Sequence, residues 1–276
     1  MPVRVESGHL DGNSHLLIFV HGYNNSRTDA LNSYATFRDH LLLKFSTLTA
    51  QIVEFLWPGD DPNKIISTLS YPNQIKPAKE SAVQLDKYFR GLGNTRPTVI
   101  HFVGHSLGCR VIVELLTAWA NASPPPNMSI GVVVLMAAAV VVKNVDSGGA
   151  LRNGATITLR NPVLYSKGDP VLQWAFPLGE TAAGEALFPV AVGRTGGPSN
   201  TWHVPQSMVH ADGKLYVHGD YWPGDESCAA VASALGGAPD LVTPVNAIAA
   251  IPAPAANAIA SRLTPVRTLP ARPAFA

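Results

Sequence analysis

The sequence has few charged residues and few cysteines. Only 14% of its 276 residues are Asp, Glu, Lys or Arg, and the formal net charge is +1. Because no basic cluster is present, we do not expect binding to nucleic acid or to an anionic membrane. The two cysteines, Cys109 and Cys228, are too few for a disulfide framework, and we expect both to be buried free thiols.

Long apolar runs and metal-ligand motifs are also lacking. The longest apolar stretch, residues 132–142, is too short to cross a bilayer. The first residues show no basic stretch followed by an apolar run, so we expect a cytoplasmic protein; a secreted protein whose signal has been removed is the alternative. His101 and His105 straddle a strand-to-turn junction, and no close carboxylate cluster is present, so neither a metal nor a cofactor is expected.

Short apolar runs alternate with helical patterns along most of the chain. This alternation predicts an α/β fold with a mainly parallel central sheet flanked by helices, and 46% apolar residues suffice for one sizeable core. The predicted strands are residues 16–20, 51–57, 98–103, 132–142 and part of 155–165; the predicted helices are 26–45, 78–92 and 107–120, and 59–77 is a predicted loop.

The last forty residues differ in composition from the rest of the chain. Alanine and proline dominate there, charges are few, and no period is sustained. We therefore expect a catalytic domain over residues 1–236 and a surface-packed or disordered extension over 237–276.

The run Gly104-His105-Ser106-Leu107-Gly108 lies between a predicted buried strand and a predicted helix. A sharp strand-to-helix turn exposes a serine hydroxyl above the sheet edge, and it leaves no room for side chains two residues before and after the serine. The following helix start directs backbone N–H groups toward an approaching oxyanion. This context predicts Ser106 as a nucleophile, with Gly104 and Gly108 supporting the turn.

Two further segments accompany this turn: His21-Gly22-Tyr23 after the first strand, and Trp57-Pro58 after the second. Together they resemble the α/β-hydrolase superfamily over about residues 15–222, and more closely a small, uncapped, bacterial esterase/lipase-like branch of serine hydrolases. The resemblance implies the α/β-hydrolase fold. Only about a dozen residues separate residue 142 from residue 155, which is too few for a large cap domain.

The same resemblance implies an oxyanion hole formed by the backbone N–H groups of Tyr23 and Leu107. Gly22 is then the residue that lets the loop approach the substrate, and His21 is expected to hold the loop by packing and hydrogen bonding. The Tyr23 side chain either lines a substrate pocket or covers the loop.

The catalytic base of this fold follows the serine and the acid along the chain. Three histidines follow Ser106: His203, His210 and His218. A short strand, then His-Gly, then aromatic residues, is how a base is delivered beside the sheet edge. This pattern favours His218, and His203 and His210 stay open as alternatives.

Two aspartates are candidates for the acid that orients the base. Asp169 lies on the turn of residues 167–170 after a predicted strand, in a segment that matches the resembling branch. Asp146 follows the preceding strand and is the alternative, because some hydrolases place the acid there. Asp169 is favoured.

These residues predict hydrolysis of small-molecule carboxylic esters, with short- to medium-chain acyl groups, through a Ser-His-Asp triad and an acyl-enzyme. Lactone or amide hydrolysis, acyl transfer, and a catalytically silent binding protein of the same fold are the alternatives. The sequence leaves the oligomeric state open. The expected site is open, and its apolar rim draws on residues 59–77 and 173–189 with Leu172, Trp174, Phe176, Leu178, Leu187 and Phe188.

Overall fold

The computed structural model describes residues 15–59, 72–92, 99–122, 125, 128–158, 160–202 and 205–237. By its contacts the chain divides into two compact units, residues 1–242 and 243–276. Everything that follows concerns the first unit. All but the first residue of the expected Ala/Pro-rich extension lies outside the described residues, so that prediction stays a prediction.

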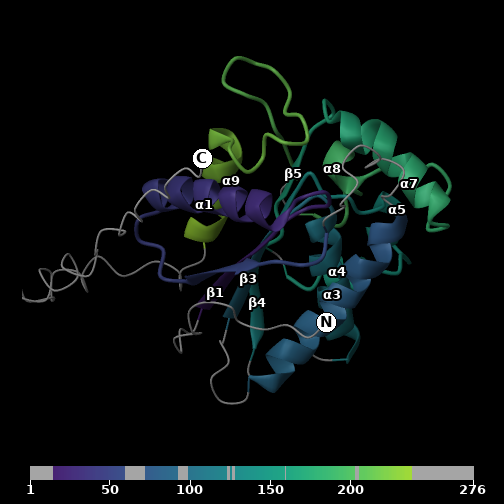
Figure 1. The fold of residues 1–276 in the computed structure, drawn as a ribbon, viewed down its shortest axis with the longest axis horizontal. Coiled ribbons are helices and arrows are strands. Elements are labelled where there is room, and N and C mark those ends of the chain that lie inside the picture. Colours follow the sequence, from purple (N-terminus) through teal and green to yellow (C-terminus); the bar gives the residue numbers. More distant parts are fainter. Residues whose placement is uncertain are drawn as a thin grey trace, which may run out of the picture. The chain divides into compact units, whose positions relative to one another are not determined.

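Six parallel strands form the central sheet, in the order β2-β1-β3-β4-β5-β6 (Figure 1). The expectation of a mainly parallel sheet is confirmed. The edge strand β6 was not predicted, because its three residues are exposed and show no apolar pattern. The strands are β1 (His15–Val20), β2 (Gln51–Phe55), β3 (Val99–His105), β4 (Ser129–Met136), β5 (Val163–Tyr165) and β6 (Pro205–Ser207).

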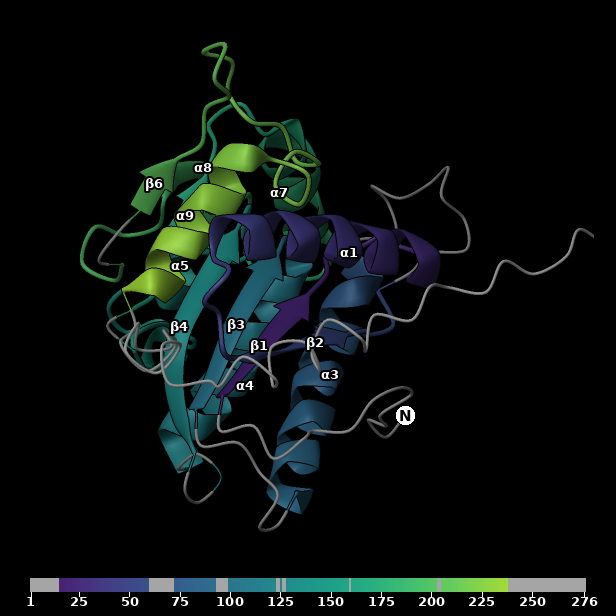
Figure 2. The same ribbon diagram turned by 90° about the vertical axis from the view of Figure 1, so that its left-hand side faces the viewer.

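Helices cover both faces of the sheet. The long helices are α1 (Arg27–Lys44), α3 (Pro72–Gly91), α4 (Leu107–Ala122) and α9 (Asp225–Gly236). Helices α1 and α9 contact each other on one face, and α3 and α4 contact each other on the opposite face (Figure 2). Within the described ranges, no helix has the length and apolar content needed to cross a membrane.

The remaining helices are short and follow β4 and β5: α5 (Val142–Val145), α6 (Arg152–Ala155), the π-helix η3 (Val171–Ala175), α7 (Phe176–Ala182) and α8 (Val192–Thr195). The segment between β4 and β5, where a cap is commonly inserted, holds only the single-turn helices α5 and α6. The prediction of no large cap domain is therefore confirmed.

Continuous apolar runs become the central strands because both of their faces are covered. In β1, the side chains of Leu17, Phe19 and Val20 are fully buried. Helix α1 begins at a capping box in which Ser26 and Asp29 exchange hydrogen bonds, as the cap residues at this point of the sequence indicate.

The predicted strand over residues 132–142 is too long at its end. Strand β4 stops at Met136, and Ala137 has a positive φ of 45°. Residues 137–141 are fully buried but irregular, because they run beneath the turn that carries Ser106. Their apolar composition indicates that these residues are buried, but the sequence pattern does not distinguish a buried irregular segment from a buried strand.

The predicted loop over residues 59–77 is also partly wrong, because α3 begins at Pro72 rather than near residue 78. Pro77 lies inside the helix, in its second turn, and removes one backbone donor there. Ile75 is only 3% exposed, so its burial in the core stabilises this additional first turn.

A buried tyrosine joins the ends of the first two strands. The Tyr34 hydroxyl on α1 accepts a hydrogen bond from the backbone N–H of His21 (2.6 Å) and donates one to the backbone oxygen of Phe55 (2.7 Å). Burial raises the pKa of Tyr34 well above its usual value, so the hydroxyl stays protonated and can donate.

We expect Tyr34→Phe to lower the free energy of unfolding by about 1–3 kcal/mol, because the buried His21 N–H loses its hydroxyl acceptor. Tyr88→Phe is the matched control, since the Tyr88 hydroxyl makes no hydrogen bond within the described residues. Urea unfolding of both variants measures the difference. Equal stabilities for the two variants would contradict the role of the Tyr34 hydroxyl.

Candidate active site

Ser106 occupies the turn between β3 and α4 in a left-handed conformation, with φ of 54°. The end of β4 and the segment that follows it hold this turn. The backbone N–H of Ser106 donates to the backbone oxygen of Met136 (3.0 Å), and the backbone oxygen of Ser106 accepts from the N–H of Ala139 (3.1 Å). A strained residue persists where the surrounding structure fixes it, and these two bonds do so here.

The flanking glycines lie where the sequence places them. A Cβ on Gly108 would clash with the backbone oxygens of Val20 and His21, so α4 packs directly against the end of β1. A Cβ on Gly104 would meet the side chain of Ile112 at 2.5 Å. Backbone cannot move aside as a side chain can, so Gly108 is the stricter requirement.

Ser106, His218 and Asp169 lie in one chain of hydrogen bonds. The Ser106 hydroxyl donates to His218 Nε2 (2.8 Å), and His218 Nδ1–H donates to Asp169 Oδ2 (2.7 Å). Asp169 is fully buried, and its second oxygen accepts from the N–H of Leu172 (3.0 Å). The His218 side chain is 18% exposed, so solvent reaches the base while the acid stays enclosed.

The alternative acid and bases lie in other surroundings. The Asp146 carboxylate accepts a hydrogen bond from the backbone N–H of the next residue, Ser147, and so stabilises the turn in which it lies. His210 pairs with Asp220 at 3.0 Å and stacks on Tyr216, with ring centroids 4.2 Å apart. His203 lies outside the described residues.

Asp220, two residues after His218, has a structural role in the loop of the base. Its Oδ2 atom accepts from the N–H of Val217 (2.7 Å) and from His210 Nε2 (3.0 Å). These bonds close the turn that holds His218. No motif indicated this contact, because it depends on a tight turn formed only in the folded loop.

A second contact ties the His218 loop to the turn that carries Asp169. The Ser166 hydroxyl donates to the backbone oxygen of Tyr216 (2.6 Å) and accepts from the N–H of Gly168 (3.1 Å). Ser166 is fully buried. One buried side chain, Ser166, therefore helps to position both the acid and the base.

The loop after β1 approaches the serine closely. A Cβ on Gly22 would lie 2.7 Å from the Cβ of Ser106, so no larger residue fits there without movement. His21 Nδ1–H donates to the oxygen of Gly22 (2.8 Å), and its ring stacks on Trp57 with centroids 5.6 Å apart. The half-buried Tyr23 packs against the core. His21 therefore holds this loop, as predicted.

His105 is a buried neighbour of the triad. Its Nε2–H donates to the backbone oxygen of His218 (2.8 Å), and the two rings are 4.9 Å apart. Burial, with the nearby His218 as a second cause, lowers the pKa of His105 to about 3. His105 is thus neutral at pH 7 and supports the loop of the base through one hydrogen bond.

Both cysteines are buried free thiols, as expected. Cys109 follows the turn on α4, and its sulfur lies 3.5 Å from the oxygen of Met136. Burial raises the pKa of both thiols, to about 11 for Cys228 and further for Cys109, so neither forms a thiolate near neutral pH.

The predicted apolar rim is correct only in part. Leu172 and Phe176 are each 1% exposed and belong to the core. The exposed apolar side chains of this region follow Asp169 on η3, on α7 and in the segment after α7; they are Val171, Trp174, Leu178, Leu187, Phe188 and Val190. Of the other rim segment, residues 60–71 lie outside the described residues.

Comparison with known proteins identifies a family. A family model described as alpha/beta hydrolase of unknown function (DUF900) matches residues 7–182, a range that includes Ser106 and Asp169 and ends before His218. No curated protein matches the sequence.

Three solved structures resemble this one in fold. An uncharacterized protein from Bacillus cereus ATCC 10987 is 13% identical with a TM-score of 0.47, covering 86% of this chain; the chain spans only 64% of that protein. The esterase Pf2001 from Pyrococcus furiosus is 12% identical with a TM-score of 0.42, covering 82% of each chain. Carboxyl esterase 2 from the fungus Tuber melanosporum is 14% identical with a TM-score of 0.40, covering 80% of this chain and 76% of that one.

Two buried histidines make the fold sensitive to acid. The pKa of His101 is lowered to about 4 and that of His105 to about 3, chiefly by burial, from an ordinary value of 6.5. As the pH falls below 6.5, the unfolded chain binds protons at these positions and the folded chain does not, so stability decreases.

We expect the His105 contribution alone to lower the free energy of unfolding by about 2 kcal/mol between pH 7 and pH 5. Urea unfolding of wild type and His105→Gln at both pH values measures it, because the variant lacks this contribution and should lose less stability over the same range. An equal loss in both proteins would show that His105 protonates freely in the folded state.

Proposed function

Since the chain belongs to the family of alpha/beta hydrolases of unknown function (DUF900), we propose that it hydrolyses carboxylic esters through Ser106, His218 and Asp169. The observation that carries this proposal is the continuous chain of two hydrogen bonds, 2.8 and 2.7 Å long, from the serine through the imidazole to a buried carboxylate. These distances suit a nucleophile, a general base and an orienting acid.

In the proposed reaction, Ser106 Oγ attacks the ester carbonyl carbon while its proton passes to His218 Nε2. Asp169 holds the imidazole in the tautomer that accepts this proton and stabilises the imidazolium that results. The tetrahedral intermediate collapses, the bond to the alcohol oxygen breaks, and His218 donates its proton to the departing alcohol. Water then attacks the acyl-enzyme by the same route and releases the carboxylic acid and the free serine.

The negative charge of the tetrahedral intermediate needs donors that are already in place. We assign this role to the backbone N–H groups of Tyr23 and Leu107. The close approach of Gly22 to Ser106 supports the first assignment, and the position of Leu107 at the start of α4 supports the second. A positive helix end at this point adds to the attraction of an oxyanion.

The surroundings favour esters with short- to medium-chain acyl groups. The apolar side chains that follow Asp169, such as Trp174 (66% exposed) and Phe188 (62% exposed), offer apolar surface to an acyl chain. An acyl chain gains free energy in proportion to the apolar area it buries against such a surface. A peptide or phosphorylated substrate would instead require polar or charged partners for its backbone or phosphate.

The nucleophile is tested by labelling with a fluorophosphonate, which forms a covalent adduct with an activated serine. We expect intact-mass analysis to show one adduct on wild type and none on Ser106→Ala. Turnover of p-nitrophenyl acetate should fall by about a thousandfold or more in that variant. Ser147→Ala, at an exposed serine, is the matched control and should label normally. Full labelling of Ser106→Ala would refute the assignment.

The acid is tested by comparing Asp169→Asn with Asp146→Asn. The asparagine amide at position 169 cannot stabilise the imidazolium, so we expect kcat for p-nitrophenyl acetate to fall by roughly a thousand- to ten-thousandfold. Asp146→Asn should keep the wild-type rate because its carboxylate bonds only within its own turn. The reverse result would assign the acid to Asp146.

A further inference from the structure

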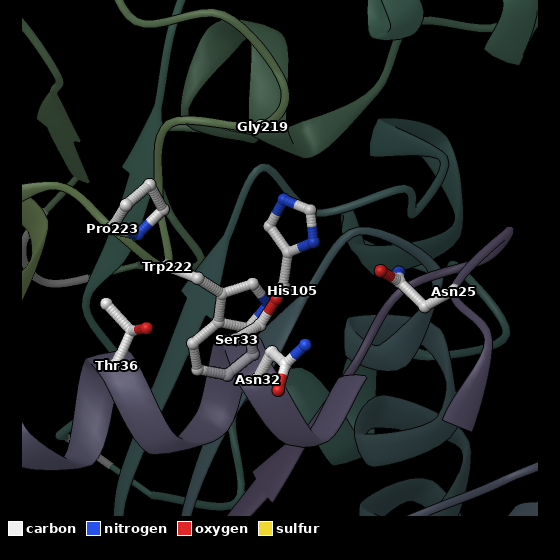
Figure 3. Close-up of a pocket in the computed structure, with 8 residues that line it drawn as sticks. All are labelled: Asn25, Asn32, Ser33, Thr36, His105, Gly219, Trp222 and Pro223. Atoms are coloured by element: carbon white, nitrogen blue, oxygen red, sulfur yellow. The ribbon is translucent and has the colours of Figure 1, made fainter. Parts of the chain in front are cut away.

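A pocket of about 320 Å³ lies between α1 and the loop that follows His218. Its volume is at the small end of the range for ligand pockets. Figure 3 shows side chains from α1 on one side, with His105 between Asn25 and the Trp222–Pro223 pair. The lining residues are Asn25, Asn32, Ser33, Thr36, His105, Gly219, Trp222 and Pro223.

The pocket is uncharged, and several of its lining side chains can form hydrogen bonds. Asn32 and Ser33 are consecutive on α1, and Thr36 follows them by four and three residues, so the helix presents an amide and two hydroxyls to the pocket. No lining residue is acidic or basic apart from His105, which is neutral because burial lowers its pKa to about 3. Such a pocket offers hydrogen bonds to a neutral ligand and no ion pair to a charged one.

Trp222 gives the pocket a rigid aromatic wall. Its ring packs edge-on against Tyr34 and Phe37, with centroids 5.3 and 5.1 Å apart, and it is only 6% exposed. The indole therefore offers the pocket an apolar ring surface, while its Nε1–H is buried away from solvent.

The pocket adjoins the triad on the side of the base. Gly219 directly follows His218, and His105 directly precedes Ser106 and bonds to the backbone of His218. In ester hydrolysis, His218 Nε2 must lie within hydrogen-bonding reach of the alcohol oxygen that departs. An alcohol part that extends from His218 toward Gly219 would reach this pocket.

We propose that this pocket binds the alcohol part of the ester and selects alcohols that carry additional free hydroxyl groups, such as glycerol or a sugar. The inference rests on the proposed function for its catalytic meaning. The side-chain amide of Asn32 and the hydroxyls of Ser33 and Thr36 bond to the additional hydroxyls, and the alcohol carbons pack against the indole ring.

The test compares kcat/KM for three acetates: ethyl acetate, glyceryl monoacetate and methyl 6-O-acetylglucoside. The acyl group is constant, so differences report on the alcohol. We expect wild type to have a higher kcat/KM for the hydroxylated acetates than for ethyl acetate. In the double variant Asn32→Leu/Thr36→Val this ratio should fall by about two- to tenfold for each hydrogen bond removed. Ethyl acetate, whose alcohol carries no further hydroxyl, is the reference for the preference of each protein. The two hydroxylated acetates distinguish a small polyol from a sugar ring.

Thr28→Val is the matched control, because Thr28 is exposed on the same helix outside the pocket. It should keep the wild-type preference. An equal preference in wild type and the double variant, with ethyl acetate still hydrolysed, would overturn the pocket assignment and leave the proposed function intact.

A binding measurement keeps the two proposals separable. Ligand-observed NMR with glycerol and with methyl glucoside should show binding to wild type and weaker binding to Asn32→Leu/Thr36→Val, which lacks two hydrogen-bonding side chains of the pocket. Binding of this kind without turnover or fluorophosphonate labelling would support the pocket and refute the hydrolase. Absence of binding together with absence of any alcohol preference refutes the pocket.

Discussion

The left-handed conformation of Ser106 is the constraint on which the rest of the site depends. A serine with φ of 54° is unfavourable in isolation, and here its backbone N–H bonds to Met136 at the end of β4 and its backbone oxygen to Ala139 in the segment that follows. The close contact of Gly108 with the end of β1 fixes the same turn from the other side. Because β1, β3 and β4 are neighbours in one sheet, the serine hydroxyl has a defined place above the sheet edge. Every other part of the site is positioned relative to that edge.

The partners of the serine reach it through loops that are themselves bonded together. Asp169 leaves β5 on a turn, and the buried Ser166 hydroxyl ties that turn to the loop of His218. Asp220 then closes the His218 turn through the N–H of Val217. Loops are usually the mobile parts of a fold, so these buried and charge-assisted bonds restrict the imidazole to one position. The position of the His218 ring thus depends on the hydrogen bonds of Ser166 and Asp220, which do not themselves involve the imidazole.

The sequence predicts the parts of this site that have a local signature. The strand-turn-helix around Ser106 needs glycines at fixed spacing, and chain order reduces the candidate partners to a few residues. Asp169 and His218 are therefore predictable, and they are the pair the structure brings to Ser106. The irregular backbone after Met136 and the role of Asp220 have no such signature, because they depend on contacts between distant segments. Apolar composition indicates burial there, but it does not specify backbone conformation.

Two adjacent histidines illustrate how surroundings decide which one is suited to act as a base. His218 has a carboxylate on one nitrogen and the serine hydroxyl on the other, and it is partly exposed. His105 is enclosed, has no carboxylate partner within the described residues, and stays neutral. In the proposed reaction the imidazolium of His218 forms 4.9 Å from the His105 ring, so a charge on His105 would oppose it. Because His105 is buried and neutral, this repulsion is absent. Its ring is also an uncharged part of the pocket wall, so a neutral hydroxylated alcohol bound there meets no unpaired charge.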